Sequence, residues 1–237
     1  MSLRIIFNTF VKKMFQRILA KFQTKLFTKS DFSKNGLKPY VIDFFLQESK
    51  GILHIGGHSG QEAEYYSRFS FPVIWIEGNP NIYPELKAKA EQFGQHAIQA
   101  LITEVDGAKI PFYLTSNNSE SASLFPLQDG NSWTSLYNTD TIYLEGRRLD
   151  SIFSSQDLNQ HNFWVIDVQG AELQVIRSAE ELMRKCCRYA LIEVSSTDFY
   201  SGGAKWHEVL SQMRKMGFIP LWLPNTNHEE VLFINSY

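Results

Sequence analysis

The residues with the clearest chemical pattern form a glycine-rich segment, His54-Ile-Gly-Gly-His-Ser-Gly60, directly after a short apolar run. Glycines there let the backbone approach a ligand closely, and the N–H groups of a helix that follows attract an anion or a carboxylate. The segment is not a phosphate-binding loop, because no Gly-Lys-Ser/Thr follows, and His58 breaks the dinucleotide fingerprint. The pattern predicts a ligand-binding turn, and a plain tight turn is the alternative.

Acidic residues end three further apolar runs. Glu77 comes 17 positions after Gly60, near the distance at which an acid meets the ribose hydroxyls of a bound nucleotide. A carboxylate can accept a hydrogen bond from each hydroxyl of such a diol. Asp167 and Glu193 are candidate catalytic residues, because a carboxylate can take a proton from a hydroxyl nucleophile. A solvated strand end at Glu77 and a helix cap at Asp167 are the structural alternatives.

Other polar residues are candidates for substrate contact. Glu172 lies in the first turn of a predicted helix, where it could touch substrate or only complement the helix dipole. Ser121 and Ser123 lie in residues 116–138, a segment rich in Ser, Asn and Gly. We predict a long loop there, and loops of that length are usually functional. The chain has no Cys-x-x-Cys or His-Glu-x-x-His motif, so we name no metal ligand. The strand-end carboxylates of Asp167 and Glu193 leave acid–base and metal chemistry as alternatives.

These residues need a sheet to bring them together, and the sequence predicts one. Short apolar runs alternate with helical patterns, which is typical of an α/β fold with an open, mostly parallel sheet. Ligands bind such sheets beyond the carboxyl ends of the strands, where the candidate acids lie. A closing hairpin adds an antiparallel strand. The predicted strands are Gly51–Ile55, Phe71–Ile76, His96–Leu101, Ile110–Thr115, Thr141–Leu144, Phe163–Val168, Tyr189–Val194, Phe218–Leu223 and Glu230–Asn235. The predicted helices are Gly60–Phe69, Pro80–Phe93, Leu149–Phe153, Ala171–Arg184 and Lys205–Met216.

Composition favours one domain and argues against some functions. The chain has 237 residues, of which 43% are hydrophobic, and a net charge of −2. Nucleic-acid-binding domains are usually strongly basic, so we expect no nucleic acid partner. The two cysteines, Cys186 and Cys187, are adjacent and poorly placed to bridge each other. We therefore expect a reducing compartment and a cytoplasmic location.

Residues 1–38 are predicted to form a basic helical extension and linker before the main domain, residues 39–237. Seven Lys and Arg residues precede the first acid, Asp31, and apolar residues recur among them at helical spacing. Such an amphipathic helix can lie on an anionic membrane surface, here the inner one, or pack on the domain or on a second subunit of a homodimer. We expect no membrane-spanning helix and no signal peptide.

Taken in order, the motifs resemble those of the FkbM family of methyltransferases. They are His54–Gly60, Ile76-Glu-Gly-Asn-Pro80, Arg148-Leu-Asp-Ser-Ile152 and Ile166-Asp-Val-Gln-Gly-Ala-Glu172, with a small-residue loop at Ser116–Leu124. The resemblance covers roughly Gly51 to Phe233. It implies a class I, Rossmann-like methyltransferase fold of seven strands, with the last one antiparallel. It also implies S-adenosyl-L-methionine as the cofactor and O-methylation of a sugar, glycolipid or other small-molecule acceptor.

The resemblance assigns roles to residues of the predicted site. The glycine turn would line the methionine end of the cofactor, Glu77 would hold the ribose, and the adenine would lie near the end of the third strand. The cofactor-binding residues implied in this way are Gly56, Gly57, His58, Gly60, Glu77, Asn79, Ala100 and Leu101.

Three positions depart from the family pattern. His54 stands where the pattern has an acid, Val165 replaces a lysine, and Gln169 replaces a glutamate. These changes imply either an altered substrate choice or a loss of catalysis. A cofactor-binding module of the same fold without catalysis is therefore an alternative, as is a nucleotide-dependent oxidoreductase.

Overall fold

The computed structural model describes residues 38–128 and 136–237. The basic amphipathic helix predicted before residue 38 lies outside them. None of the helices in the described part of the chain is both long and apolar enough to cross a membrane.

The chain divides into two compact units, Met1–Glu48 and Ser49–Tyr237. In the first unit, α3 spans Lys38–Gln47, a helix that the sequence did not predict. The second unit holds both sheets and the remaining described helices. The buried side chains of α3 are Val41, Phe44, Phe45 and Leu46.

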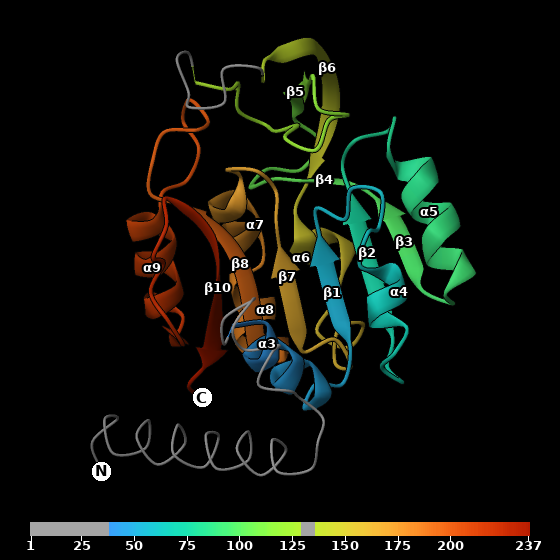
Figure 1. The fold of residues 1–237 in the computed structure, drawn as a ribbon, viewed down its shortest axis with the longest axis vertical. Helices are drawn as coiled ribbons and strands as arrows, with labels where there is room; N and C mark the ends of the chain where they lie inside the picture. Colours follow the sequence, from blue (N-terminus) through green and yellow to red (C-terminus); the bar gives the residue numbers. More distant parts are fainter. Residues whose placement is uncertain (1–37, 129–135) are drawn as a thin grey trace, which may run out of the picture. The chain divides into compact units, whose positions relative to one another are not determined.

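The larger sheet of the second unit has seven strands in the order β3-β2-β1-β7-β8-β10-β9 (Figure 1). Neighbouring strands from β3 to β8 are parallel, and β10 runs antiparallel to β8 and β9. The predicted open sheet with an antiparallel last strand is confirmed. The strand order reverses between β1 and β7, where such sheets bind ligands. The strands are β1 Ile52–Ile55, β2 Val73–Glu77, β3 His96–Gln99, β7 Phe163–Ile166, β8 Tyr189–Ser195, β9 Phe218–Pro220 and β10 His228–Asn235.

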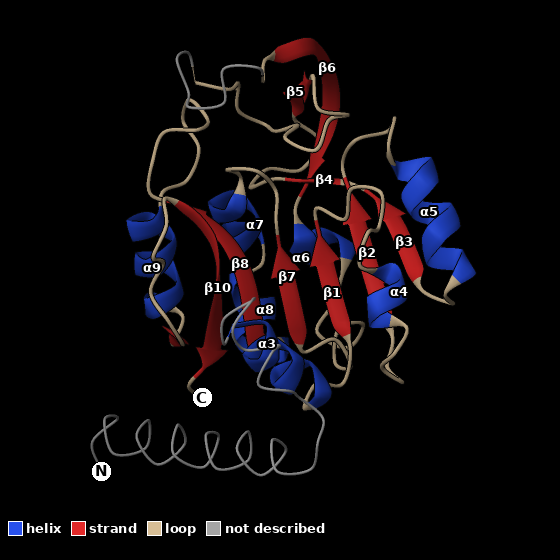
Figure 2. Cartoon of the chain, viewed as in Figure 1, coloured by secondary structure: helices blue, strands red, loops and turns tan. Residues whose placement is uncertain are grey.

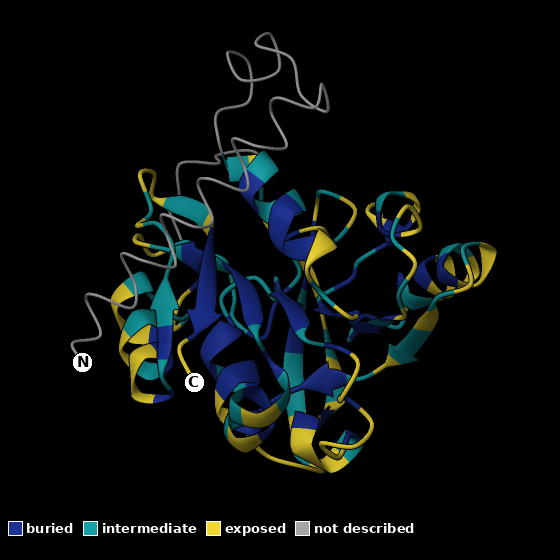
Figure 3. Ribbon diagram, turned by 90° about the horizontal axis from the view of Figure 1, so that it is seen from below, coloured by how far each residue is buried: buried dark blue, intermediate teal, exposed yellow. Residues whose placement is uncertain are grey.

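The central strands are buried on both faces, which is why they are apolar without alternation. Every residue of β1 and β7 is buried, and Figure 3 shows the buried strands at the centre of the unit. Trp164 and Phe233 of the sheet share one buried cluster with Val175, Met183 and Met213 of the helices. Burial of these large apolar side chains is the main stabilising contribution to the fold.

Two helices differ from the prediction. The predicted helix Gly60–Phe69 is reduced to α4. Gly60 has a positive φ of 71°, which is not helical, and at the other end the Ser67 hydroxyl donates to the Glu64 carbonyl at 2.7 Å. The predicted helix Ala171–Arg184 is divided at Ala179, whose φ of −139° is not helical. The helices of this unit are α4 Ala63–Tyr66, α5 Tyr83–Gln92, α6 Leu149–Ile152, α7 Glu172–Ser178, α8 Glu180–Cys186 and α9 Trp206–Lys215.

A second sheet of three strands lies beyond the carboxyl ends of β1 and β2 (Figure 2). Its order is β4-β6-β5, with β4 at Leu101–Ile102, β5 at Lys109–Thr115 and β6 at Asn138–Arg147. The sequence predicted β5, a shorter part of β6, and no separate sheet. The small sheet covers the carboxyl ends of β1 and β2, where ligands are expected to bind.

The chain passes from one sheet to the other at Ala100, so the predicted strand His96–Leu101 is two strands. Leu101 packs closely over Gly78, where an added Cβ would lie 2.9 Å from the Leu101 Cδ1 atom. Glycine at position 78 is what lets β4 turn back across the end of β2.

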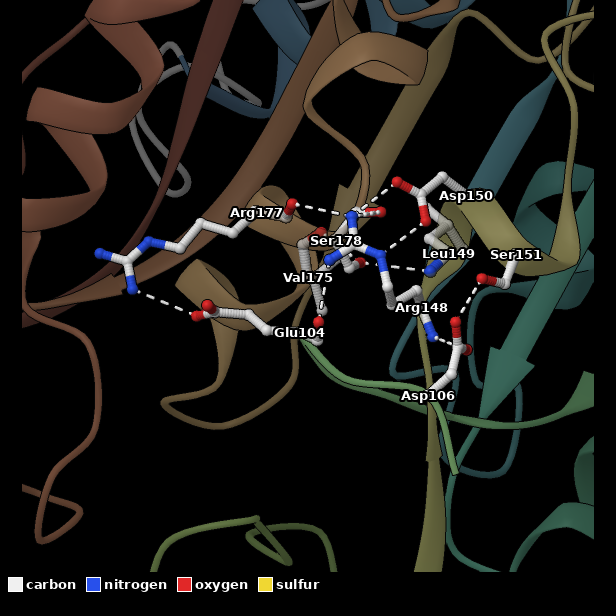
Figure 4. Close-up of polar contacts among 9 residues, drawn as sticks. All are labelled: Glu104, Asp106, Arg148, Leu149, Asp150, Ser151, Val175, Arg177 and Ser178. Carbon is white, nitrogen blue, oxygen red and sulfur yellow. Dashed lines mark hydrogen bonds and ion pairs between the residues drawn. The ribbon is translucent and has the colours of Figure 1, made fainter. Parts of the chain in front are cut away.

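The side chain of Arg148 ties the small sheet to the helical layer (Figure 4). Its guanidinium makes a bidentate ion pair with Asp150 at 2.6 and 2.8 Å. It also donates to the carbonyl oxygens of Glu104 at 2.8 Å and Ser178 at 3.2 Å. The Ser178 carbonyl belongs to the end of α7, so Arg148 satisfies a group that a continuous helix would have bonded internally. This contact stabilises the break between α7 and α8.

Replacing Arg148 by Ala should lower the free energy of unfolding by roughly 1–3 kcal/mol, because buried carbonyl groups lose their donor. The exposed part of the ion pair adds little. Urea unfolding would measure the loss, with Arg147→Ala as the matched control. Arg147 is 45% exposed and lies 3.6 Å from Asp106. Equal destabilisation by both substitutions would contradict the role given to Arg148.

Candidate functional site

A cavity of about 390 Å³ lies at the carboxyl ends of β1, β2 and β7, beneath the small sheet. Its wall includes the turn after β1 and the acids that end β2 and β7. Apolar residues from β4 and β5 close the other side. The predicted site residues that line it are Gly56, Gly57, His58, Glu77, Ala100, Leu101 and Asp167. The predicted residues outside its lining are Gly60, Asn79, Ser121, Ser123, Glu172 and Glu193.

The glycine turn is held tightly between two strands. Gly56 has a φ of +90°, and an added Cβ would lie 1.6 Å from the Asp167 carbonyl oxygen. The N–H groups of Gly56 and Gly57 both donate to the Ile76 carbonyl, at 2.9 and 3.0 Å. Gly60 also has a positive φ and packs against Leu86 instead of facing the cavity. The turn therefore has one geometry, which only glycine permits at position 56.

The Glu77 carboxylate is fixed at the edge of the cavity by the backbone of the turn. It accepts hydrogen bonds from the His58 N–H at 2.8 Å and from the Asn79 N–H at 2.7 Å. Burial raises the pKa of Glu77, and these two hydrogen bonds oppose that shift. Beside it, the buried Asn79 Nδ2 has no hydrogen-bond partner within the described residues. The carboxylate oxygens retain lone pairs that a ligand can use.

Gln169 joins the two acids that were predicted as catalytic. Its side-chain amide donates to Asp167 Oδ1 and to Glu193 Oε2, both at 2.7 Å. The side-chain oxygen Oε1 of Gln169 accepts a hydrogen bond from the Tyr200 hydroxyl at 2.6 Å. The backbone at Gln169 is left-handed, with a φ of 55°, which turns the side chain toward both carboxylates. Asp167 and Glu193 are thus brought together, although only Asp167 lines the cavity.

Charge in this network is shared among its members. Burial, followed by the negative charge of Glu193, raises the pKa of Asp167 well above its ordinary value. Glu193 also pairs with His228, whose Nε2 lies 2.8 Å from its Oε1 atom. This hydrogen bond raises the pKa of His228 above its ordinary value, against the effect of partial burial. Asp167, whose carboxylate can accept a proton, therefore lines the cavity, whereas Glu193 and His228 lie outside its lining.

The other predicted acid has a local role in the structure. Glu172 is 3% exposed, and its Oε1 atom accepts the Gly170 N–H at 2.9 Å. Burial raises the pKa of this carboxyl to about 7. Its hydrogen bond closes the turn that leads from β7 into α7.

The two predicted serines lie outside the cavity lining and form hydrogen bonds to residues of neighbouring segments. The Ser123 hydroxyl donates to the Gln169 carbonyl at 2.6 Å, and the Ser121 hydroxyl accepts from the Asn117 side chain at 3.0 Å. Both serines are buried. Their neighbours in the chain, including Glu120 and Leu124, line the cavity instead. The loop is therefore part of the wall, but through different residues.

Several lining residues were missed in the sequence. They include Gln61, Glu62, Tyr66, Phe112 and Glu230. Glu62 directly follows the glycine turn, so its position could have marked it. Glu230 lies opposite Glu193 in the β8–β10 pairing, and this becomes visible only once the strand order is known. Tyr66 and Phe112 carry no sequence signal that separates them from core residues.

The sequence model of the family "methyltransferase FkbM domain" matches residues 54–220, which is more than half of the chain. The chain belongs to the FkbM methyltransferase family. The resemblance seen in the ordered motifs is thereby confirmed. The cavity described above lies within an FkbM methyltransferase domain.

Solved structures of other methyltransferases match the chain at low sequence identity. An FkbM methyltransferase from Methylobacillus flagellatus matches with a TM-score of 0.49 and 11% identity, over 79% of this chain and 44% of that one. The chain thus spans less than half the length of that protein. Aeropyrum pernix fibrillarin, solved with S-adenosyl-L-methionine, has a TM-score of 0.49 and 11% identity, over 80% and 68%. An Aquifex aeolicus SAM-dependent methyltransferase has a TM-score of 0.47 and 14% identity, over 90% and 96%. No curated protein matches the chain in sequence.

The structure shows the surroundings of two residues that depart from the FkbM pattern, Gln169 and Val165. A glutamate at position 169 would put a third carboxylate between Asp167 and Glu193, and the amide of Gln169 instead donates to both. Val165 lines the cavity and is 5% exposed. With valine there, the described residues that line the cavity include no Lys or Arg.

Replacing His228 by Gln should lower stability mainly at acidic pH. Because the pKa of His228 is raised in the folded protein, its contribution is fully present below about pH 6.5, the ordinary value. That contribution is lost as the pH rises through the raised pKa. Urea unfolding of both proteins at pH 5.5, 7 and 8.5 would measure it, with His207→Gln on α9 as the control. A difference that is constant with pH, or larger at high pH, would contradict this pairing.

Proposed function

We propose that the chain is an S-adenosyl-L-methionine-dependent O-methyltransferase that acts on an uncharged hydroxyl acceptor such as a sugar, a glycolipid or another small molecule. The observation that carries the proposal is that a single cavity is lined by the glycine turn, by Glu77 and by Asp167. A cofactor held by Glu77 and the turn would therefore lie beside the Asp167 carboxylate.

The wall of the cavity fits the cofactor part by part. The Glu77 carboxylate, held by two backbone N–H groups, is placed to accept hydrogen bonds from the two ribose hydroxyls. Ala100, Leu101 and Phe112 provide an apolar surface beside it, which suits the faces of an adenine ring. The close backbone approach at Gly56 and Gly57 leaves room for the methionine end. S-adenosylmethionine, when bound, supplies a methyl group on a positively charged sulfur.

The charge of the cavity supports an uncharged acceptor. Its described lining contains the carboxylates of Glu62, Glu77, Glu120, Asp167 and Glu230, and no Lys or Arg. Such a field attracts a cationic cofactor and repels a phosphate or carboxylate on the acceptor. A neutral hydroxyl, as in an unmodified saccharide, is not repelled in this way.

In this proposal the protein acts by placing the reactants and by taking up one proton. The acceptor oxygen forms a bond to the methyl carbon as the carbon–sulfur bond breaks, and the hydroxyl proton passes to Asp167. The raised pKa of Asp167 makes its carboxylate a better base. Gln169 and Glu193 hold that carboxylate in position, and Glu193 acts through Gln169 because it does not line the cavity.

Replacing Glu77 by Ala should weaken the binding of S-adenosylhomocysteine at least about tenfold, because two hydrogen bonds to a charged group are lost. Titration calorimetry would measure the change. Glu91→Ala, on the exposed face of α5, is the matched control, and thermal unfolding would check that Glu77→Ala still folds. Unchanged affinity in a folded Glu77→Ala protein would remove Glu77 from the cofactor site.

Replacing Asp167 by Asn should reduce turnover roughly 100-fold or more while S-adenosylhomocysteine still binds. Turnover would be followed as S-adenosylhomocysteine release with a panel of neutral methyl glycosides and their phosphorylated counterparts. The neutral members are expected to react. A fully active Asp167→Asn protein would exclude the proposed base. Cofactor binding without turnover of any acceptor would favour a binding module without catalysis.

A further inference from the structure

His54 cannot supply the negative charge that its position has in the family pattern. The residue is 5% exposed, and its ring stacks on Trp75 with centroids 4.5 Å apart. Its Nδ1 atom lies 3.2 Å from the Tyr66 hydroxyl. Burial lowers the pKa of His54 to about 3, so the imidazole is neutral at physiological pH. A neutral, stacked ring with one nitrogen already bonded is a poor partner for a cation.

A carboxylate stands close to His54 on the same wall. Glu62 comes two residues after Gly60 and directly before α4, and it lines the cavity. Tyr66 follows it by four residues, which places the two side chains on one face of the turn. The charge of Glu62 contributes to the raised pKa of Tyr66, after burial. Tyr66 in turn contacts His54, so Glu62, Tyr66 and His54 form one continuous patch.

This carboxylate is not engaged within the protein. In residues 38–128 and 136–237, no hydrogen bond or ion pair to the Glu62 side chain is found, and the residue is exposed. The carboxylates of Asp167 and Glu230 are among those that line the same cavity. Desolvation and then the charges of Asp167 and Glu62 raise the pKa of Glu230 to about 7, although the residue is exposed to solvent. A cation in this part of the cavity would relieve the repulsion among the three acids.

The cofactor of the proposed function carries such a cation at its methionine end. In the proposed function Glu77 would hold the ribose at the end of β2, and the methionine end would lie along the turn after β1, which lines the same cavity. Glu62 is the acid that directly follows this turn. Glu230 lies on β10, which is separated from β1 by β7 and β8, and Asp167 already accepts the Gln169 amide.

We infer that Glu62 binds the α-ammonium group of the cofactor and replaces the acid that is missing at position 54. The inference rests on the proposed function and names a residue for it. In the bound state the Glu62 carboxylate accepts N–H hydrogen bonds from the ammonium, and Tyr66 holds His54 away from it.

The test compares two ligands by titration calorimetry. One is S-adenosylhomocysteine, and the other is its analogue with hydrogen in place of the α-amino group. Glu62→Gln should weaken S-adenosylhomocysteine about tenfold and leave the analogue unchanged. Glu64→Gln removes the same charge from the exposed side of α4 and should change neither affinity. Glu230→Gln should have a smaller effect than Glu62→Gln.

Each other result has a distinct meaning. Unchanged S-adenosylhomocysteine affinity in Glu62→Gln would overturn the inference and leave the proposed function intact. Equal weakening of both ligands would also overturn it, since the effect would not depend on the ammonium. A larger loss in Glu230→Gln would move the ammonium site to β10. If neither ligand bound the wild-type protein, the proposed function itself would fail.

Discussion

The site depends on the close approach of two backbones at the reversal of strand order. Gly56 at the end of β1 lies so near the Asp167 carbonyl at the end of β7 that a Cβ atom would meet it at 1.6 Å. This contact sets the separation of the two strand ends, and with it the distance from the glycine turn to the Asp167 side chain. The same turn donates its N–H groups to Ile76 and Glu77. The ends of β1, β2 and β7 are therefore positioned by this one turn, whose approach to β7 requires glycine at position 56.

Around this constraint the polar groups are arranged by charge. The Gln169 amide separates two carboxylates that would otherwise repel, and His228 balances the second of them from the antiparallel strand. The antiparallel strand is thus part of the support of the site as well as of the sheet. Its insertion between β8 and β9 is what brings His228 and Glu230 to the same end as Asp167.

Much of this architecture could be predicted because it is encoded locally. Buried parallel strands such as Phe163–Ile166 are short apolar runs, and the turn residues from His54 to Gly60 are adjacent in the sequence. The small sheet was missed because the change of sheet at Ala100 depends on Leu101 packing over Gly78, a contact between separate segments. The break at Ala179 was missed for a similar reason, since the Arg148 side chain that bonds to the Ser178 carbonyl comes from a segment 30 residues earlier. Within the site, Glu230 required the strand order, whereas Ser123 and Glu172 were chosen by type and proved to bond to the backbone.

The small sheet has its own apolar cluster, formed by Leu101, Phe112, Leu114, Leu124 and Ala171, and this cluster is separate from the core beneath the large sheet. Val168 packs against both clusters. A substitution in β5, or in the loop that follows it, therefore alters the cavity wall formed by Phe112 and Leu124 without removing contacts from the main core. The shape of this wall can thus change while the core of the large sheet keeps its packing.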